Sequence, residues 1–143
     1  MNKTKTFFIV DDDYDDHQLF YEAVATVDKS YRCMSAYNGE EALQKLEYFL
    51  PEVPDYIFLD LNMPRLNGKQ CLALIKKIEA LAQVPVVIYT TSASPDDIKD
   101  TYNLGATFFI TKPRTFDDIC KVINLVLYTD RTEAKHVFHL KSN

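Results

Sequence analysis

Four short apolar runs in this sequence each end in polar side chains that could take part in chemistry. In chain order, the polar groups are Asp11-Asp12-Asp13, Asp60, Thr90 and Lys112. Carboxylates held within about 4 Å of one another repel by roughly 4 kcal/mol per pair at an effective dielectric near 20, so an ionised cluster requires a cation. Oxygen ligands with no His or Cys nearby favour a hard ion such as Mg²⁺. A lysine and a hydroxyl opposite the acids suit a phosphoryl group, so the pattern predicts a phosphoryl group held on a carboxylate beside Mg²⁺.

Asp60, considered alone, has a simpler interpretation, because aspartate often ends a strand and begins a turn. The residues after it predict an irregular loop, since Pro64 lacks an N–H donor and Asn67-Gly68 is a strong turn signal. The other strand ends favour a chemical role instead. Chance places one or two polar residues at such points, but it does not readily supply acids, a hydroxyl and a lysine together.

The apolar runs have the length and composition of strands that are buried on both faces. The expected strands cover residues 7–10, 31–36, 56–59, 84–89 and 107–111. Helical periodicity predicts helices over residues 14–27, 40–50, 68–82, 95–104 and 116–127. A βα order repeated five times predicts a doubly wound α/β domain, with a parallel sheet covered by helices on both faces. In such a sheet the ligand site lies outside the carboxyl ends of the strands.

The length of 143 residues fits one domain over residues 1–129, followed by a tail at 130–143 that leaves no room for an output domain. Three cysteines, Cys33, Cys71 and Cys120, form no CxxC pair, so we expect buried free thiols in a reducing compartment. The N-terminus has only four consecutive apolar residues before the aspartates, too few for a signal peptide or a membrane span. These features predict a cytoplasmic protein without membrane insertion. A net charge of −5 predicts no broad nucleic-acid surface.

Four motifs in a fixed order make the sequence resemble the receiver domain of two-component response regulators. They are the paired acids after the first expected strand, DLNMPRLNG starting at Asp60, Thr90 after the fourth strand, and Lys112-Pro113 after the fifth. The resemblance covers about residues 5 to 128. It implies a CheY-like, five-stranded parallel sheet of order 2-1-3-4-5 in a flavodoxin-like three-layer sandwich.

The same resemblance implies a stand-alone response regulator that signals by changing conformation. A sensor histidine kinase or a histidine phosphotransfer protein would donate a phosphoryl group to Asp60. An unidentified downstream protein would then recognise the face formed by the fourth helix, the fifth strand and the fifth helix. The protein would catalyse only its own phosphorylation and dephosphorylation and would not be an enzyme for a separate substrate. No nucleic-acid partner is implied.

The resemblance also assigns roles to individual residues. Asp60 would be the phosphoacceptor. Asp12, Asp60 and the backbone carbonyl of Asn62 would hold Mg²⁺ directly, and Asp11 would act through a water molecule. Asp13 matches no essential position, although a shift of one residue within the triplet would exchange it with Asp11. Because the apolar run ends immediately before Asp11, the pair Asp11-Asp12 is favoured.

Lys112 would contact the phosphoryl group, while Thr90 and Phe109 would form the pair that switches conformation. Phe109 stands where tyrosine is more familiar, so only its packing could switch. Three residues occupy positions that tune access to the site or the lifetime of the aspartyl phosphate, namely Asn62, Thr91 and Ser92. Thr91 stands where a smaller residue is usual and is expected to narrow access, whereas Arg114 has no assigned role.

Three other interpretations are open at this point. FFIVDDDY, residues 7–14, also resembles the nucleophile motif of phosphatases of the haloacid dehalogenase type, which would place the covalent phosphate on Asp11. That family gives no reason for the LDLNMP motif around Asp60. A receiver-like domain could also work as an interaction module without phosphorylation. A flavodoxin-like nucleotide binder is disfavoured, because the chain has only three glycines and no glycine-rich loop.

The histidines and the tail carry weaker expectations. His17 is expected to be solvated or to flank a helix. His136 and His139 are three residues apart but lack a third ligand, so no metal site is expected there. Three apolar tail residues are expected to pack on the domain or on a partner, namely Val137, Phe138 and Leu140.

Overall fold

The apolar runs form one parallel sheet whose strand order is β2-β1-β3-β4-β5-β6. A computed structural model of the chain describes residues 5–129 and 138–140. The strands are β1 (Lys5–Val10), β2 (Tyr31–Ala36), β3 (Tyr56–Leu59), β4 (Val86–Thr90), β5 (Phe108–Thr111) and β6 (His139–Leu140). The predicted parallel order of the first five strands is confirmed. The short β6 was not expected from the sequence, and it makes the sheet six-stranded instead of five-stranded.

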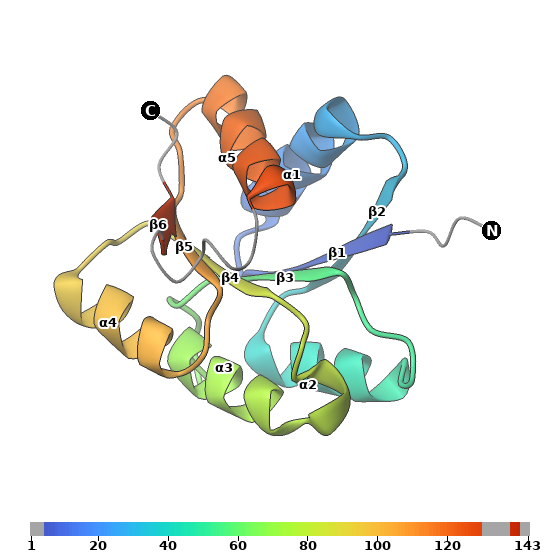
Figure 1. Cartoon of the computed structure of the whole chain (residues 1–143), viewed down its shortest axis with the longest axis vertical. Coiled ribbons are helices and arrows are strands. Elements are labelled where there is room, and N and C mark those ends of the chain that lie inside the picture. The colour runs from blue at the N-terminus through green and yellow to red at the C-terminus, as the bar shows by residue number, and fades with distance from the viewer. Residues whose placement is uncertain (1–4, 130–137, 141–143) are drawn as a thin grey trace.

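Helices cover both faces of the sheet, with α1 and α5 on one face and α2, α3 and α4 on the other (Figure 1). The helices are α1 (Tyr14–Val27), α2 (Gly39–Tyr48), α3 (Gly68–Lys77), the 3₁₀ helix η1 (Glu79–Leu81), α4 (Pro95–Asn103) and α5 (Phe116–Tyr128). The expected helix over residues 68–82 is interrupted, because Ile78 adopts an extended conformation (φ −81°, ψ 113°) that ends α3. The doubly wound architecture is otherwise as predicted.

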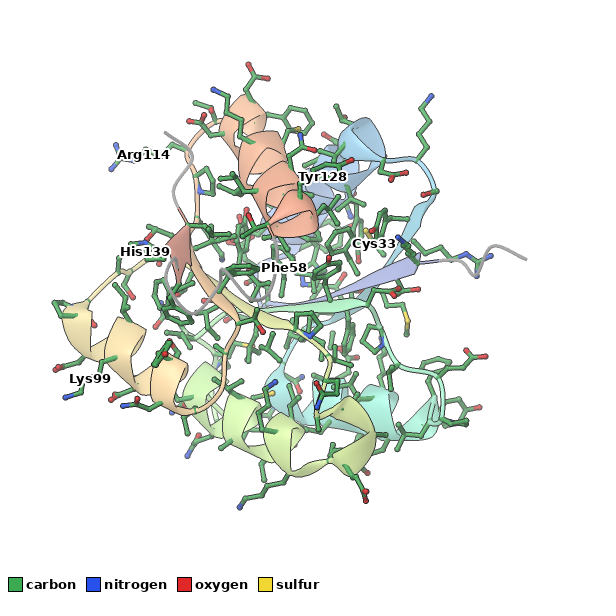
Figure 2. The ribbon with its side chains drawn as sticks, in the orientation of Figure 1. Cys33, Phe58, Lys99, Arg114, Tyr128 and His139 are labelled. Atoms are coloured by element: carbon green, nitrogen blue, oxygen red, sulfur yellow. The ribbon has the colours of Figure 1, made fainter. Side chains whose placement is uncertain are left out.

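Side chains of the central strands enter two cores, one on each face of the sheet. In β1, Phe8 and Val10 pack toward α2 and α3, whereas Phe7 and Ile9 pack toward α1 and α5. All four side chains are at most 1 % exposed. Phe58 of β3 lies between the sheet and the α1–α5 layer (Figure 2). Burial on both faces explains why the strands are continuous apolar runs in the sequence.

Each α-helix begins at a residue whose side chain accepts a hydrogen bond from the first helical turn. The N-cap residues are Asp13, Asn38, Asn67, Ser94 and Thr115. Such a cap typically stabilises a helix by about 1 kcal/mol. Asn67 also forms a capping box with Gln70, which fixes the point where the loop after β3 enters α3. The loops at the carboxyl edge of the sheet are therefore anchored at their helical ends.

The described part of the tail packs against β5 and α4. The amide of Phe109 donates to the carbonyl of Phe138 at 2.9 Å, and Leu140 is only 5 % exposed. The ring centroid of Phe138 lies 5.2 Å from that of Tyr102 in α4, in an edge-to-face arrangement. Of the two placements expected for the tail, packing on the domain is found for Phe138 and Leu140, while Val137 lies outside the described residues.

The three cysteines are free thiols in different surroundings. Cys71 is buried, and burial raises the pKa of its thiol to about 12. Cys33 and Cys120 are half-buried, so the expectation of buried thiols is confirmed for Cys71 alone. Within residues 5–129 and 138–140, no helix has the length and apolar character needed to cross a membrane.

Candidate functional site

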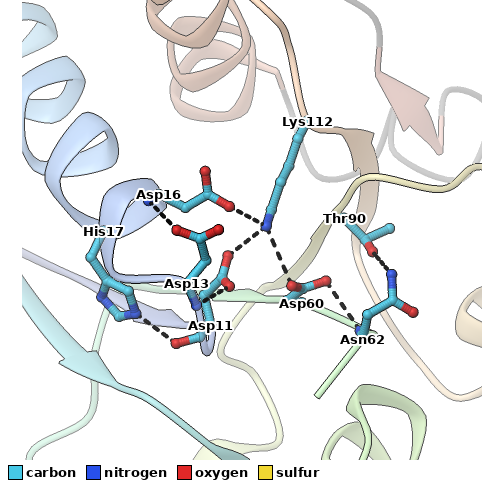
Figure 3. A network of polar contacts seen from close by, with 8 residues as sticks. All are labelled: Asp11, Asp13, Asp16, His17, Asp60, Asn62, Thr90 and Lys112. Atoms are coloured by element: carbon cyan, nitrogen blue, oxygen red, sulfur yellow. Dashed lines mark hydrogen bonds and ion pairs between the residues drawn. The ribbon is translucent and has the colours of Figure 1, made fainter. Parts of the chain in front are cut away.

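The carboxyl ends of four strands bring the predicted polar residues together (Figure 3). Asp11 follows β1 and Asp60 follows β3, and these two strands pair in parallel register. The amide of Asp60 donates to the carbonyl of Val10 at 2.9 Å. On the far side of β3, where β4 and β5 pair, the amide of Lys112 donates to the carbonyl of Thr90 at 2.7 Å. Sheet hydrogen bonds thus set the backbone positions from which all these side chains reach the site.

The Lys112 ammonium group is surrounded by carboxylates. Its Nζ atom lies 2.6 Å from Asp16 Oδ2, 2.7 Å from Asp11 Oδ2 and 3.3 Å from Asp60 Oδ2. The lysine side chain is only 9 % exposed. Burial by itself would lower the pKa of Lys112, but its contacts with Asp11 and Asp16 outweigh burial and raise the pKa. Lys112 is therefore a fixed positive charge beside Asp60.

Carboxylate oxygens of Asp11, Asp12 and Asp60 lie within 4.8 Å of one another, close enough to share one metal ion. Asp11 and Asp60 are buried, whereas Asp12 is exposed. Burial raises the pKa of Asp11 to about 7, against the lowering effect of Lys112. Within the described residues, the Lys112 ammonium group at 2.7 Å is the one partner of Asp11 Oδ2. A buried oxygen with spare acceptor capacity in an all-oxygen cluster fits a hard divalent cation.

Asn62 joins Asp60 to Thr90 in a way that the sequence did not indicate. Its backbone amide donates to Asp60 Oδ1 at 3.2 Å, and its side-chain amide donates to Thr90 Oγ1 at 3.3 Å. The two oxygens of Asp60 are thus oriented by different partners, Asn62 on one side and Lys112 on the other. Thr90 is fully buried, so its hydroxyl depends on such internal partners. The role of the Asn62 carbonyl as a metal ligand stays a prediction.

The loop after Asp60 folds tightly against the start of α3. A Cβ atom at Gly68 would collide with the backbone carbonyl of Asp60 and lie 2.5 Å from Leu61 Cα. The amide of Gly68 also donates to the Leu61 carbonyl at 3.0 Å. Glycine is therefore required at this position for close approach of two backbone segments. Arg65 completes the turn with a φ of 64°, in the left-handed region.

His17 is fully buried, so the expectation of a solvated or helix-flanking residue is wrong. Its Nε2 atom donates to the Asp11 carbonyl at 2.7 Å, and its ring stacks on that of Tyr37 with 4.3 Å between centroids. The helical spacing of His17, Phe20 and Val24, which share the buried face of α1, was a signal for this placement. His17 therefore stabilises the backbone at Asp11, within the acid cluster, through this hydrogen bond.

Asp13 and Asp16, at the start of α1, make different contacts. Asp13 caps the helix by accepting the amide of Asp16 at 3.1 Å, which agrees with its having no essential role in the cluster. Asp16 was not singled out from the sequence, yet it contacts Lys112, which lies 96 residues away along the chain. No local feature distinguishes Asp16 from Asp15, so this contact could be found only in the folded structure.

Phe109, the predicted switch residue, is fully buried on the face covered by α2, α3 and α4. Its ring centroid lies 5.5 Å from that of His139 and 6.3 Å from that of Phe138. Its coupled movement with Thr90 stays a prediction. His136 lies outside the described residues, so the expectation that it and His139 hold no metal is untested.

Thr91 and Ser92 lie in the loop between β4 and α4. Thr91 is exposed, whereas Ser92 is half-buried and its hydroxyl donates to Asp97 Oδ2 at 3.5 Å. Arg114 is exposed and points away from the domain (Figure 2). The influence of Thr91 and Ser92 on access and lifetime stays a prediction.

The fold and the site together define a flavodoxin-like α/β domain with an acidic, lysine-containing site at the carboxyl edge of its sheet. Comparison with known proteins specifies the class, because the family model for the response regulator receiver domain matches residues 7–124. The chain belongs to this family.

Known relatives cover most of the chain. Response regulator Rcp1 from Synechocystis sp. is 32 % identical over 126 residues, which are 85 % of this chain and 86 % of Rcp1. The crystal structure of the phosphorylated cyanobacterial phytochrome response regulator RcpA has a TM-score of 0.80 and 33 % identity, covering 90 % of this chain and 97 % of that one. The Mn²⁺-bound form of Rcp1 has a TM-score of 0.78 and 30 % identity, covering 88 % and 96 %. The predicted family and fold are confirmed.

Proposed function

We propose that this protein is a response regulator that receives a phosphoryl group on Asp60 and passes the signal on through protein contact. The observation that carries the proposal is the setting of Asp60. Its side chain is 6 % exposed, lies 3.3 Å from Lys112 Nζ and clusters with Asp11 and Asp12. Phosphoryl transfer to a carboxylate needs a nucleophile, a positive charge near the phosphoryl oxygens and a divalent cation, and the side chains around Asp60 suit all three needs.

In the proposed transfer, an Asp60 oxygen attacks the phosphorus of a phosphohistidine, the P–N bond breaks, and the histidine nitrogen leaves with the bonding electron pair. The Asn62 amide and the Lys112 ammonium group already orient the two Asp60 oxygens, so little reorganisation is needed. Lys112 then contacts a phosphoryl oxygen. Mg²⁺ held by Asp12, Asp60 and the Asn62 carbonyl, with Asp11 acting through water, would neutralise charge on the phosphoryl group.

Mg²⁺ is the proposed ion because carboxylate oxygens are the ligands it prefers. Mn²⁺, which is bound in the Rcp1 structure, also accepts oxygen ligands and should occupy the same group of acids. Either ion would offset the mutual repulsion of Asp11, Asp12 and Asp60.

Thr90 links phosphorylation to conformation in this proposal. Its hydroxyl now accepts a hydrogen bond from Asn62, and donation to a phosphoryl oxygen would draw Thr90 toward Asp60. Movement of Thr90 would change the space available to Phe109, whose ring neighbours Phe138. A downstream protein that recognises the face formed by α4, β5 and α5, with β6 paired to the edge of β5, would then sense the state of Asp60.

A histidine kinase or a histidine phosphotransfer protein is the proposed donor. RcpA is a phytochrome response regulator, so a phytochrome-type histidine kinase is one donor to assay with this chain. The protein would act on no separate substrate, because its chemistry would be limited to its own phosphorylation and dephosphorylation. The cytoplasmic location stays a prediction.

Incubation with acetyl phosphate and Mg²⁺ tests the proposal. We expect one phosphoryl group per chain by intact-protein mass spectrometry, and none on Asp60→Asn. Asp96→Asn, which alters an exposed acid in the first turn of α4, should be labelled like the wild type. Undiminished labelling of Asp60→Asn would contradict the proposal, and a phosphoryl group mapped to Asp11 would favour the phosphatase alternative.

A further inference from the structure

Asp16 makes the shortest contact of Lys112, although it lies outside the acid cluster that fits a metal. Its Oδ2 atom is 2.6 Å from Lys112 Nζ, compared with 3.3 Å for Asp60 Oδ2 (Figure 3). Asp16 stands in the first turn of α1, and its backbone amide is held by the Asp13 cap. The contact therefore ties the ammonium group of Lys112 to α1.

An ammonium group has three hydrogen atoms to donate, and Lys112 already has three carboxylate partners. Two of them, Asp11 and Asp60, belong to the acid group that could share a metal ion, whereas Asp16 does not. A divalent cation would offset the charge of these two partners and leave Asp16 as the carboxylate still paired with Lys112. A phosphoryl group on Asp60 needs that same ammonium group.

The Asp16–Lys112 pair is partly shielded from water. The side chain of Lys112 is 9 % exposed and that of Asp16 is 29 % exposed. Solvent therefore screens this pair less than a pair on the open surface. Asp15, in the same helical turn, is exposed and lies outside the network drawn in Figure 3, so it offers a matched control for loss of one negative charge.

We propose that Asp16 is a positioning residue that competes with the phosphoryl group for Lys112. This competition weakens the contact between Lys112 and a phosphoryl group on Asp60. The inference rests on the proposed function, because it requires a phosphoryl group at Asp60. Before phosphorylation, Asp16 keeps Lys112 in place. After phosphorylation, Asp16 draws the ammonium group away from the phosphoryl oxygens.

Beryllofluoride, a non-covalent mimic of a phosphoryl group on aspartate, tests the competition. Its affinity is measured by ¹⁹F NMR at saturating Mg²⁺ for the wild type, Asp16→Asn, Asp16→Glu and Asp15→Asn. We expect Asp16→Asn to bind beryllofluoride about threefold to tenfold more tightly than the wild type. Asp15→Asn should stay within about twofold, since its charge does not contact Lys112. Asp16→Glu keeps the charge and should bind like the wild type.

A second neutral variant and a metal titration complete the test. Asp16→Ser should show the same gain as Asp16→Asn, and Mn²⁺ affinity measured by electron paramagnetic resonance should change less than about twofold in both. Unchanged or weaker beryllofluoride binding by both neutral variants overturns the inference, as does a loss of Mn²⁺ affinity of about tenfold, which would make Asp16 a metal ligand. A wild type that binds no beryllofluoride overturns the proposed function as well, whereas binding without a gain in the variants rejects the inference alone.

Discussion

Two regions of the sheet are held together by different kinds of contact, namely the polar half at the carboxyl ends of β1 and β3 and the aromatic half along the β5–β6 edge. Beside β1 and β3, Asp11, Asp60 and Lys112 form ion pairs of 2.7 and 3.3 Å, with side chains at most 9 % exposed. Beside β5, contacts between aromatic rings join Phe109 to Phe138, and β6 has only two residues. Separating buried charges leaves them unpaired and is costly, whereas apolar contacts can repack at lower cost.

This difference suits the proposed function, in which the protein binds a phosphoryl group at one place and changes shape at another. The polar half holds its groups in position before any ligand arrives, which lowers the reorganisation needed for chemistry. The aromatic half depends on a short edge strand, so local opening there should require less free energy than opening of the central strands.

Gly68→Ala should disturb the polar half most. The added Cβ collides with the Asp60 carbonyl, so we expect a loss of about 3 kcal/mol in unfolding free energy, measured by urea denaturation. Labelling by acetyl phosphate should also slow, because Asp60 is displaced. Gly105→Ala, at a φ of 99° and with the flexible Lys76 side chain nearest at 3.5 Å, should cost about 1 kcal/mol and leave labelling unchanged. Equal effects of the two substitutions on labelling would break the contrast.

The titration of Asp11 should make the unfolding free energy of the metal-free protein depend on pH. Burial raises its pKa from an ordinary value of 3.8 to about 7. Its contribution to stability is therefore complete below about pH 4 and is lost as the pH rises toward 7, because the folded state must then hold a buried ionised carboxylate. Relative to Asp11→Asn, we expect the metal-free wild type to lose on the order of 2 kcal/mol across this window in urea titrations.

Mg²⁺ provides the control for the Asp11 measurement. At pH 8 it should raise the unfolding free energy of the wild type and have a much smaller effect on Asp11→Asn, because binding requires the ionised carboxylate. A difference between the two proteins that does not vary with pH would show that burial of Asp11 is not the cause.

Leu140→Ala probes the aromatic half. Leu140 is 5 % exposed in β6, so truncation should destabilise that strand by about 2 kcal/mol. The amide of Phe109, which donates to Phe138, should then exchange with deuterium roughly thirtyfold faster, as seen by NMR. The amide of Asp60 should be unaffected, since it donates to Val10 in the central sheet. Equal acceleration at both amides would mean that the two halves open as one unit.

Thr91→Ala should have the smallest effect. Thr91 is exposed in the loop after β4, and a smaller side chain there should widen access to Asp60 for a small donor. A modest increase in the rate of labelling by acetyl phosphate is expected, without a change in stability. An unchanged rate would show that Thr91 does not narrow access.

The structure differs from the sequence predictions for two kinds of reason. His17 was expected to be solvated or to flank a helix, but the helical period places it on the buried face of α1 with Phe20 and Val24, where Nε2 donates to the Asp11 carbonyl. The break at Ile78 and the pairing of β6 with β5, by contrast, depend on tertiary contacts. Local propensity is a weak guide wherever a tertiary contact compensates for it.

The sequence alone determined the parallel architecture and the core of the site. Each buried central strand is visible as a continuous apolar run. The polar residue directly after the run is the site residue, so Asp60, Thr90 and Lys112 could be identified without knowledge of any interatomic distance. Parallel strands then gather their carboxyl ends at one edge.

Only the tertiary structure decided which of several similar residues share that site. Asp16, and not Asp15, reaches Lys112 across 96 residues because one helical step turns a side chain by about 100°. In the same way, the pairing of β6 with β5 depends on where the tail returns to the sheet. Such contacts join distant parts of the chain, and no pattern within either part records them.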